Sequence, residues 1–555
     1  MTLPLQIAAV ALALMTGQGP QEKVPLYDGL GDHHHEITTK VPQAQKYFDQ
    51  GLRLTYAFNH PEAIRSFEEA ARLDPACAMC WWGVALALGP NINAPMDEAA
   101  GAKANAAVVK AMERMGGASR KEQAFIRALA KRYAAASAAQ SPSRDSAYAF
   151  AMGEVVQRMP QENDAVVLWA DALMNLSPWD YWVPSDPAKR GTAVKPGTVW
   201  TPGGSQPRQH MVDAIESLQR VLERSPDHAG ACHLFIHAVE EAYPERAVAC
   251  AERLPALMPG AGHIAHMPGH IYIRVGRYND AIERNIHAAH ADNAILEDIA
   301  PDGLYRIGYV PHNHHFLWFA ATMAGRTRMA LDAAQQTASM ATRELASLLP
   351  VQQFLMTPLF ADVRFERWDA ILASAAPETG AYTMGVWHYA RAIALAGKGR
   401  IAEAKQEHAK LRAVREKGAL GEGLVGFNSP ASILEIADAV VEGEIAAREQ
   451  RWDVAIRALR RGVELEDLQT YGEPPDWHVP VRHNLGAVLL AAKRAAEAEA
   501  AFREDLHRFP ENGWSLLGLA RSLEAQNRTA DARAMHERFQ KAFADADVAR
   551  GLMKY

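Results

Sequence analysis

The chain is long enough for several domains or for one extended array of repeats, with 555 residues, 49% of them hydrophobic and 22% charged. This composition excludes a disordered polymer. The formal net charge of -7 shows no basic excess, which argues against a protein built to neutralise many nucleic acid phosphates. We therefore expect no nucleic acid partner.

The first residues have the character of an export signal. The stretch 3–15 is uncharged and apolar, is followed by small and turn-forming residues, and is too short to span a bilayer unaided. No Lys or Arg precedes Lys23, so an ordinary buried first helix is the alternative. We expect a signal peptide over residues 1–19 and export to the periplasm or the extracellular space, with a cytoplasmic protein as the alternative. No other segment is predicted to be transmembrane.

Four cysteines fall into two pairs, Cys77 with Cys80 and Cys232 with Cys250, which suits an oxidising compartment without requiring one. The stretch from Cys77 to Trp82 lacks the His that would follow in a c-type haem site, and it has no βαβ context. We expect Cys77 and Cys80 to be free or to form a local disulfide. The sequence leaves the pairing open.

A repeated helical hairpin accounts for most of the chain. Residues 44–75 carry small, aromatic and proline residues at spacings that let two antiparallel helices pack closely and then end. The residues at these positions are Ala44, Tyr47, Gly51, Ala63, Phe67, Ala70 and Pro75. Further units follow, many of them degenerate. The pattern resembles the tetratricopeptide repeat (TPR) family, which implies an all-α solenoid of helical hairpins with a concave groove.

Several segments follow from this pattern. Residues 20–43 form an N-terminal arm with the tract Asp32-His33-His34-His35, which can fold back as a metal-binding arm or stay solvated. The stretch 177–206 is rich in proline and tryptophan, and we expect a loop insertion over one face, either a functional lid or a plain insertion. TPR-like repeats occupy the rest, in an N-terminal group (44–176), a histidine-rich central group (207–345) and a C-terminal group (346–555).

Half of the 22 histidines lie between His228 and His315. Counted from the prolines that end the preceding repeats, two of the first helices in this region begin at Ala229 and Gly262. In the repeat family, positions two, five, nine and twelve of a first helix line the concave groove, so the resemblance implies that side chains at these positions face one cavity. The residues concerned are His233, His237, Glu240, His263, His266, His270, His312 and His315.

These residue types and spacings favour a metal site. Neutral imidazole is a common ligand of zinc, copper and iron, and residues three or four apart on a helix are neighbours. Adjacent helices pack about 8–10 Å apart, so ligands from two helices can converge. We therefore expect the histidines and Glu240 to bind one or two divalent transition metal ions, zinc, copper or iron.

Other interpretations stay open. The histidines can instead recognise an acidic or polar ligand, or form structural hydrogen bonds. For the whole protein, the alternative to a metal-dependent enzyme or metal carrier is a non-catalytic scaffold that binds a peptide or protein partner in its groove. The sequence does not identify the metal, reaction, substrate, partner or oligomeric state.

Two strings of residues resemble those of a group of uncharacterised bacterial exported TPR proteins. They are Gly31-Asp32-His33-His34-His35 and the stretch from Cys77 to Trp82, which is followed by Gly89-Pro90-Asn91-Ile92-Asn93. This resemblance implies the fold and carries no reaction or substrate.

Overall fold

The computed structural model describes residues 24–133, 140–184, 205–295, 303–341, 345–378, 380–417 and 420–548. Most of these residues are helical and few lie in strands, which confirms the predicted all-α fold class. The expected signal peptide lies outside the described residues. Among the helices described, none is both long and apolar enough to cross a membrane.

The chain forms two compact units. Of the described residues, those within 24–184, 205–271 and 287–310 belong to the first unit, and those within 272–286 and 311–548 belong to the second. The helices of the first unit are α2 (Pro42–Tyr56), α3 (His60–Leu73), α4 (Ala78–Ala87), α5 (Glu98–Arg114), α6 (Arg120–Ala130), α7 (Pro142–Arg158), α8 (Asn163–Met174), α9 (Gln209–Arg224), α10 (Ala229–Val239), α11 (Val248–Leu257) and α12 (Gly262–His266). The helices α13 (Pro268–Arg274) and α14 (Tyr278–Ile295) contribute residues to both units.

The first hairpin shows how small and large residues hold two helices together. Phe67 of α3 is completely buried, and its ring packs against Gly51 of α2. A Cβ atom at Gly51 would lie 2.7 Å from that ring, so only glycine permits the close approach. Asn59 begins α3, because its side chain accepts a hydrogen bond from the backbone N–H of Glu62.

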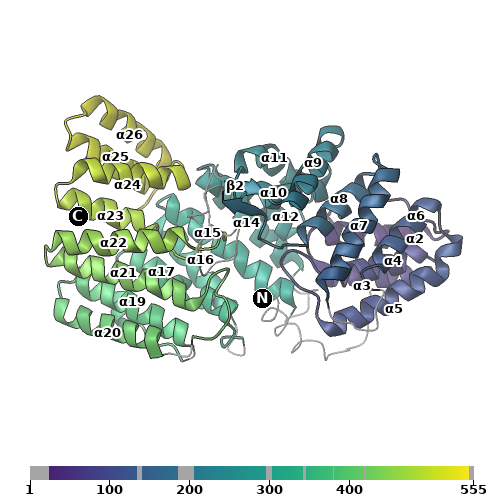
Figure 1. Ribbon diagram of the computed structural model, residues 1–555, viewed down its shortest axis with the longest axis horizontal. Helices are drawn as coiled ribbons and strands as arrows, with labels where there is room; N and C mark the ends of the chain where they lie inside the picture. Colours follow the sequence, from purple (N-terminus) through teal and green to yellow (C-terminus); the bar gives the residue numbers. More distant parts are fainter. Residues whose placement is uncertain are drawn as a thin grey trace. The chain divides into compact units, whose positions relative to one another are not determined.

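The second unit is a stack of helical hairpins, as the green and yellow part of Figure 1 shows. Several hairpin turns contain a residue in the left-handed region, with φ between 51° and 63°. These residues are Glu366, Gln450, Lys493 and Asn527. The paired helices are α15 (Val310–Met323) with α16 (Thr327–Ser339), α17 (Leu349–Arg364) with α18 (Trp368–Ala373), α19 (Ala381–Gly397) with α20 (Ile401–Lys417), α21 (Pro430–Arg448) with α22 (Trp452–Asp467), α23 (Val481–Ala491) with α24 (Ala495–Arg508), and α25 (Gly513–Glu524) with α26 (Thr529–Ala542).

The expected loop insertion begins and ends in a small sheet. Strand β1 (Trp182–Pro184) pairs antiparallel with β2 (Ser205–Pro207), so that Val183 lies opposite Gln206. Trp182 is buried, and its Nε1–H donates to the carbonyl oxygen of Ala238 at 3.1 Å. The base of the insertion is therefore anchored against α10. The residues between the strands lie outside the described part of the chain.

Candidate metal centre

Two helices of the first unit carry four of the eight predicted ligands. α10 begins at Ala229 and α12 begins at Gly262, which are the helix starts that the repeat phase predicts. His233 and His237 consequently lie one turn apart on α10, and His263 is the second residue of α12. The predicted ligands in this unit have exposed fractions of only 0–2%, and they are His233, His237, Glu240, His263, His266 and His270.

Hydrogen bonding orients His233 so that its Nε2 atom faces another imidazole. Its Nδ1–H donates to the backbone carbonyl oxygen of Tyr56 at 2.6 Å. In the neutral ring the lone pair then lies on Nε2, which is 3.2 Å from Nε2 of His263. One ring nitrogen from each of His233, His237 and His263 lies within 4.8 Å of the other two. Three imidazoles thus converge at distances suited to one metal ion.

Glu240 accepts a hydrogen bond from His237 and lies close to the imidazole of His270. Its Oε1 atom is 3.3 Å from Nδ1 of His237, and its Oε2 atom is 3.0 Å from Nδ1 of His270. A histidine that donates Nδ1–H to a carboxylate presents Nε2 to a metal, the usual arrangement around metal-bound histidine. Nε2 of His237 has no hydrogen-bond partner among the described residues, and Nε2 of His270 lies 2.9 Å from Nε2 of His266.

The buried environment sets the protonation states of the cluster. Burial, together with the neighbouring imidazoles, lowers the pKa of His233 and His263 well below 6.5. Burial also lowers the pKa of His237, despite the opposing attraction of Glu240. For Glu240, burial alone would raise the pKa, but the charges of His270 and His237 bring it below its ordinary value. The neutral imidazoles of His233 and His263 and the ionised carboxylate of Glu240 are protonation states that bind a metal ion.

Aromatic side chains surround the imidazoles. The Phe58 ring stacks on His237 with 6.0 Å between ring centroids and on His263 with 5.6 Å. Trp179, at the start of the loop insertion, meets His237 edge-on at 5.2 Å, and Tyr309 meets His263 edge-on at 4.7 Å. This apolar shell limits the access of water to the imidazole nitrogens.

The last two predicted ligands, His312 and His315, belong to the second unit, on α15. The His315 ring stacks on Trp318 with 5.1 Å between centroids, and burial lowers its pKa to about 3. The His312 ring meets Phe316 edge-on at 5.0 Å.

A second histidine cluster surrounds Asp164, near the start of α8. Nε2 of His33 is 2.9 Å from Oδ1 of Asp164, and Nδ1 of His35 is 2.7 Å from Oδ2. The Tyr56 hydroxyl donates to Oδ1 at 2.6 Å. Burial alone would raise the pKa of Asp164, but hydrogen bonds from His228, His33 and His35 bring it well below its ordinary value. The histidine tract of the arm therefore folds back onto the repeats.

The tautomer of His228 argues against a metal ion in this second cluster. His228 is the N-cap of α10, where its Nδ1 accepts a hydrogen bond from the backbone N–H of Ala231 at 3.2 Å. The proton of the neutral ring then lies on Nε2, 3.3 Å from Oδ1 of Asp164. A nitrogen that carries a proton cannot bind a metal. We assign the cluster to the docking of the N-terminal arm.

Tyr56, Phe58 and Asp164 were not among the predicted site residues. Tyr56 and Phe58 lie at the end of α2 and in the following turn, where Phe58 has a φ of 56°. Such a φ is uncommon for a bulky residue, so the backbone angle marks this turn as unusual. The sequence alone does not show it. Asp164 lies in an ordinary helical pattern, and no local feature of the sequence distinguishes it.

The two cysteine pairs differ. Cys77 and Cys80 form a local disulfide at the start of α4, one of the two alternatives predicted for them. Cys232 and Cys250 are buried thiols. A hydrogen bond between Cys232 and Cys250, together with burial, raises the pKa of the Cys232 thiol.

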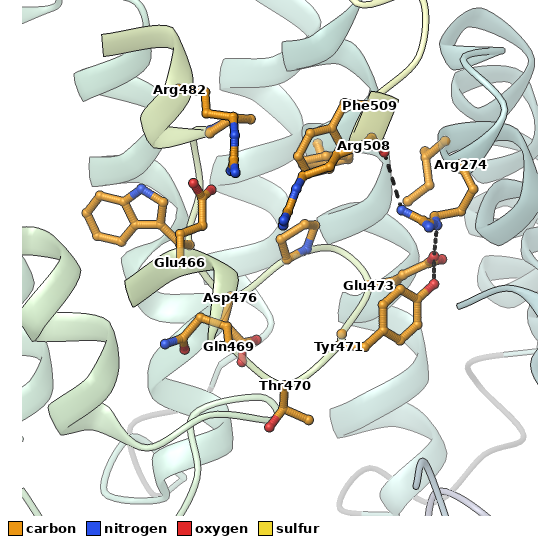
Figure 2. A pocket seen from close by; sticks show the side chains of 16 residues that line it. Arg274, Glu466, Gln469, Thr470, Tyr471, Glu473, Asp476, Arg482, Arg508 and Phe509 are labelled. Atoms are coloured by element: carbon orange, nitrogen blue, oxygen red, sulfur yellow. Dashed lines mark hydrogen bonds and ion pairs between the residues drawn. The ribbon is translucent and has the colours of Figure 1, made fainter. Parts of the chain in front are cut away.

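The second unit contains a cavity with several charged side chains in its lining, shown in Figure 2. Arg482 donates two hydrogen bonds of 2.7 Å to Asp467, and Arg508 contacts the same carboxylate at 2.9 Å. Arg274 lies 3.5 Å from Glu473, which accepts a hydrogen bond from Tyr471. The three arginines of this cavity are therefore already paired with carboxylates.

Comparison with known proteins identifies the repeat. Residues 489–554 match the family model described as tetratricopeptide repeat, over the part of the chain that contains α24, α25 and α26. Residues 489–554 therefore carry tetratricopeptide repeats. The match supports the predicted repeat family in this C-terminal part of the chain and does not bear on the group of bacterial exported proteins. No curated protein matches the sequence.

Solved structures align with the TPR chain over most of its length at low similarity. Human IFIT1, as a dimer with m7Gppp-AAAA, has 12% identity and a TM-score of 0.29 over 92% of each chain. Cut9, in the APC/C hetero-tetramer Cut9-Hcn1, has 12% identity and a TM-score of 0.32 over 89% of this chain and 76% of that one. The TPR domain of P58(IPK) has 12% identity and a TM-score of 0.23 over 88% and 99%. At these TM-scores the alignments carry no argument about function.

Proposed function

We propose that the first unit is a metal-binding TPR module that holds a divalent transition metal ion, zinc, copper or iron, between His233, His237 and His263. The main support is the distance of 3.2 Å between Nε2 of His233 and Nε2 of His263. The Nδ1–H of His233 already donates to the carbonyl oxygen of Tyr56, so its Nε2 atom is left for the metal ion. A tetrahedral ion with metal–nitrogen bonds of about 2.0–2.1 Å separates neighbouring ligands by roughly 3.3 Å. The observed separation fits that geometry.

The hydrogen bonds made by the second ring nitrogens of His233 and His237 support the same assignment. Metal-bound histidines almost always donate their second N–H to a carbonyl or carboxylate group, which sets the ring orientation and raises ligand basicity. Tyr56 supplies such a carbonyl to His233, and Glu240 supplies a carboxylate to His237 and His270. His237 also has a buried Nε2 atom without a partner among the described residues, and burying such an atom costs about 1–3 kcal/mol. A bound metal ion would satisfy it.

The depth of the site favours a firmly held ion over a hydrolytic centre. Catalytic zinc sites keep one position open to water or substrate, whereas structural sites are closed. His233 and Glu240 have no exposed surface, and His237 and His263 are 2% exposed. We therefore propose storage, structural stabilisation or electron transfer as the role of the ion, and we assign no reaction to it.

Elemental analysis of the purified protein tests this proposal. We expect about one transition metal ion per chain after dialysis, and a loss of that ion in His237→Gln and in His263→Gln with unchanged helical circular dichroism. His536→Gln is the matched control, because His536 is partly exposed and pairs with Glu524 on the far C-terminal hairpin. A wild-type protein that binds no transition metal when it is supplied in excess would refute the proposal.

The second candidate function is a scaffold that binds a partner in its groove. TPR proteins commonly act in this way, and the first helices of the second unit line a cavity. This function predicts an association that survives metal chelation, whereas a metal-dependent association would be lost with EDTA.

We also propose that the protein is exported. The support is the apolar stretch 3–15 together with the Cys77–Cys80 disulfide, since disulfides persist mainly in oxidising compartments. Expression of the full chain with a C-terminal tag, followed by fractionation and N-terminal sequencing, tests export. Retention of Met1 in a cytoplasmic product would contradict it.

A further inference from the structure

A cavity of about 350 Å³ lies along the first helices of the hairpins in the second unit. Five successive hairpins contribute to it through α17, α19, α21, α23 and α25. Side chains one turn apart on a helix face it together, as Glu444 and Arg448 do on α21. The cavity is at the small end of the range for small-molecule sites.

One guanidinium in this cavity has unused hydrogen-bond donors. Arg364 is the last residue of α17, and its Nε and Nη2 atoms are buried without a hydrogen-bond partner among the described residues. Its guanidinium lies 3.6 Å from the ring centroid of Trp514, over the ring. That contact uses the face of the guanidinium, whereas the N–H groups point outward in its plane. The stacking therefore leaves the donors unsatisfied.

The two unused atoms define the kind of group that fits. Nε–H and Nη2–H are parallel donors on one side of the guanidinium, and two oxygens of one carboxylate or phosphate accept from such a pair. Burial lowers the pKa of Arg364 to about 9, so the group remains a cation at neutral pH. The arginines of the cavity in Figure 2 have no such unused donors to offer, because Arg482 and Arg508 both contact the carboxylate of Asp467.

The charge of the lining favours a monoanion. Three arginines, Arg364, Arg448 and Arg521, and two carboxylates, Glu366 and Glu444, line the cavity, and the carboxylate of Asp505, outside the lining, also acts on Arg364. A phosphate dianion would meet repulsion from these carboxylates, whereas a single carboxylate adds only one negative charge.

A histidine beside Arg364 supplies an acceptor. Nε2 of His483 lies 2.9 Å from Oδ2 of Asp505, and a carboxylate can only accept, so the proton of the neutral ring is on Nε2. Burial, opposed by Asp505 and reinforced by the charge of Arg364, lowers the pKa of His483. Its Nδ1 atom is buried without a partner among the described residues and is available to a hydroxyl or amide donor. The remaining wall is largely apolar and aromatic, with Tyr389, Ile393 and Leu517.

We propose that this cavity binds a small organic monocarboxylate that also carries an apolar body and a hydrogen-bond donor. Its carboxylate accepts from Nε and Nη2 of Arg364, and its donor group faces Nδ1 of His483. The apolar body packs beside Trp514. This site is in the second unit and does not depend on the metal proposal.

Isothermal titration of the full chain tests the assignment with matched probes. The carboxylates are 3-phenyllactate, 3-phenylpropionate and hexanoate, the neutral controls are the corresponding amides, and phenyl phosphate is the alternative anion. We expect 3-phenyllactate to bind saturably and about ten- to a hundredfold more tightly than its amide, because the charge-assisted pair is lost in the amide. 3-Phenylpropionate should bind more weakly than 3-phenyllactate.

Variants separate binding from folding. Arg364→Met should abolish binding while raising the melting temperature of the ligand-free protein, because it removes a buried charge that forms no salt bridge with the described residues. Arg364→Lys keeps the charge but loses the paired donors, and it should bind at least tenfold more weakly. The control is Arg367→Gln, outside the cavity, where the exposed Arg367 lies near Asp362. The proposal is overturned if no carboxylate binds more tightly than its amide, if phenyl phosphate binds best, or if Arg364→Met leaves binding unchanged.

Discussion

The backbone carbonyl of Tyr56 accepts the Nδ1–H of His233, although the two residues are 177 positions apart in the chain. The Tyr56 hydroxyl donates to Asp164 at the same time. One residue of the first hairpin thus contacts both the imidazole cluster and the anchor of the N-terminal arm. Four predictions follow from these contacts and from the cavity of the second unit that Figure 2 shows.

The first prediction concerns the carboxylate that orients two imidazoles. Glu240→Gln keeps the size of the side chain but removes its charge, so the rings of His237 and His270 lose their ionic acceptor. We expect metal affinity to fall about ten- to a hundredfold, as when other residues that hydrogen-bond to metal ligands are substituted. Competition with a chromophoric chelator measures it. Glu241→Gln is the neighbouring control, and an equal loss there would point to a general loss of structure.

The second prediction concerns removal of the metal ion. A ligand that binds only the folded protein stabilises it by about 2.7 kcal/mol when its free concentration is a hundred times Kd. EDTA should therefore lower the unfolding temperature of the wild-type protein and leave that of His263→Gln unchanged. Differential scanning calorimetry in buffered zinc and in EDTA makes the comparison. Equal EDTA effects on both proteins would contradict binding at His263.

The third prediction concerns docking of the arm. Asp164→Asn removes the anion that His33 and His35 share, and it also weakens the bond from Tyr56. We expect the free energy of unfolding to fall by about 2–3 kcal/mol, since buried hydrogen bonds to a charged group contribute about 1.5–3 kcal/mol. Limited proteolysis should cut within residues 24–41 sooner than in the wild-type protein. The exposed Asp213→Asn variant should be cut at the wild-type rate.

The fourth prediction concerns pH and Glu466, beside Arg482 in Figure 2. Burial, reinforced by Asp467 and opposed by Arg482, raises the pKa of Glu466 from 4.5 to about 8. The folded state therefore binds the proton more tightly than the unfolded state, and its stability falls as the pH rises from about 4.5 to about 8. The slope is at most about 1.4 kcal/mol per pH unit for one proton.

Glu466→Gln should flatten this part of the stability profile and make the protein more stable than the wild type at pH 8. Denaturant unfolding at pH 5, 6.5 and 8 gives the comparison, and Glu464→Gln on the exposed side of α22 is the control. A parallel pH dependence in Glu466→Gln and the wild-type protein would show that another group is responsible.

Local repetition made much of the fold predictable. Prolines and small residues at family spacings predicted the helix starts at Ala229 and Gly262, and helix geometry then brought His233 and His237 to one face. The partners that orient these rings could not be predicted in this way. Tyr56 and Asp164 act across more than 100 residues of chain, and the pairing depends on how the hairpins stack. The unsatisfied donors of Arg364 could not be predicted from the sequence either, because they result from the absence of a nearby acceptor among the described residues in the folded chain.

The contact between Arg364 and Trp514 joins the first and the last of five successive hairpins. Solenoids commonly diverge by gaining or losing whole repeats, since each repeat contacts mainly its neighbours. Here a single added or deleted hairpin between α17 and α25 would separate the guanidinium from the indole by a full repeat. Natural variation in this part of the protein should therefore proceed by exchange of side chains at a constant number of repeats.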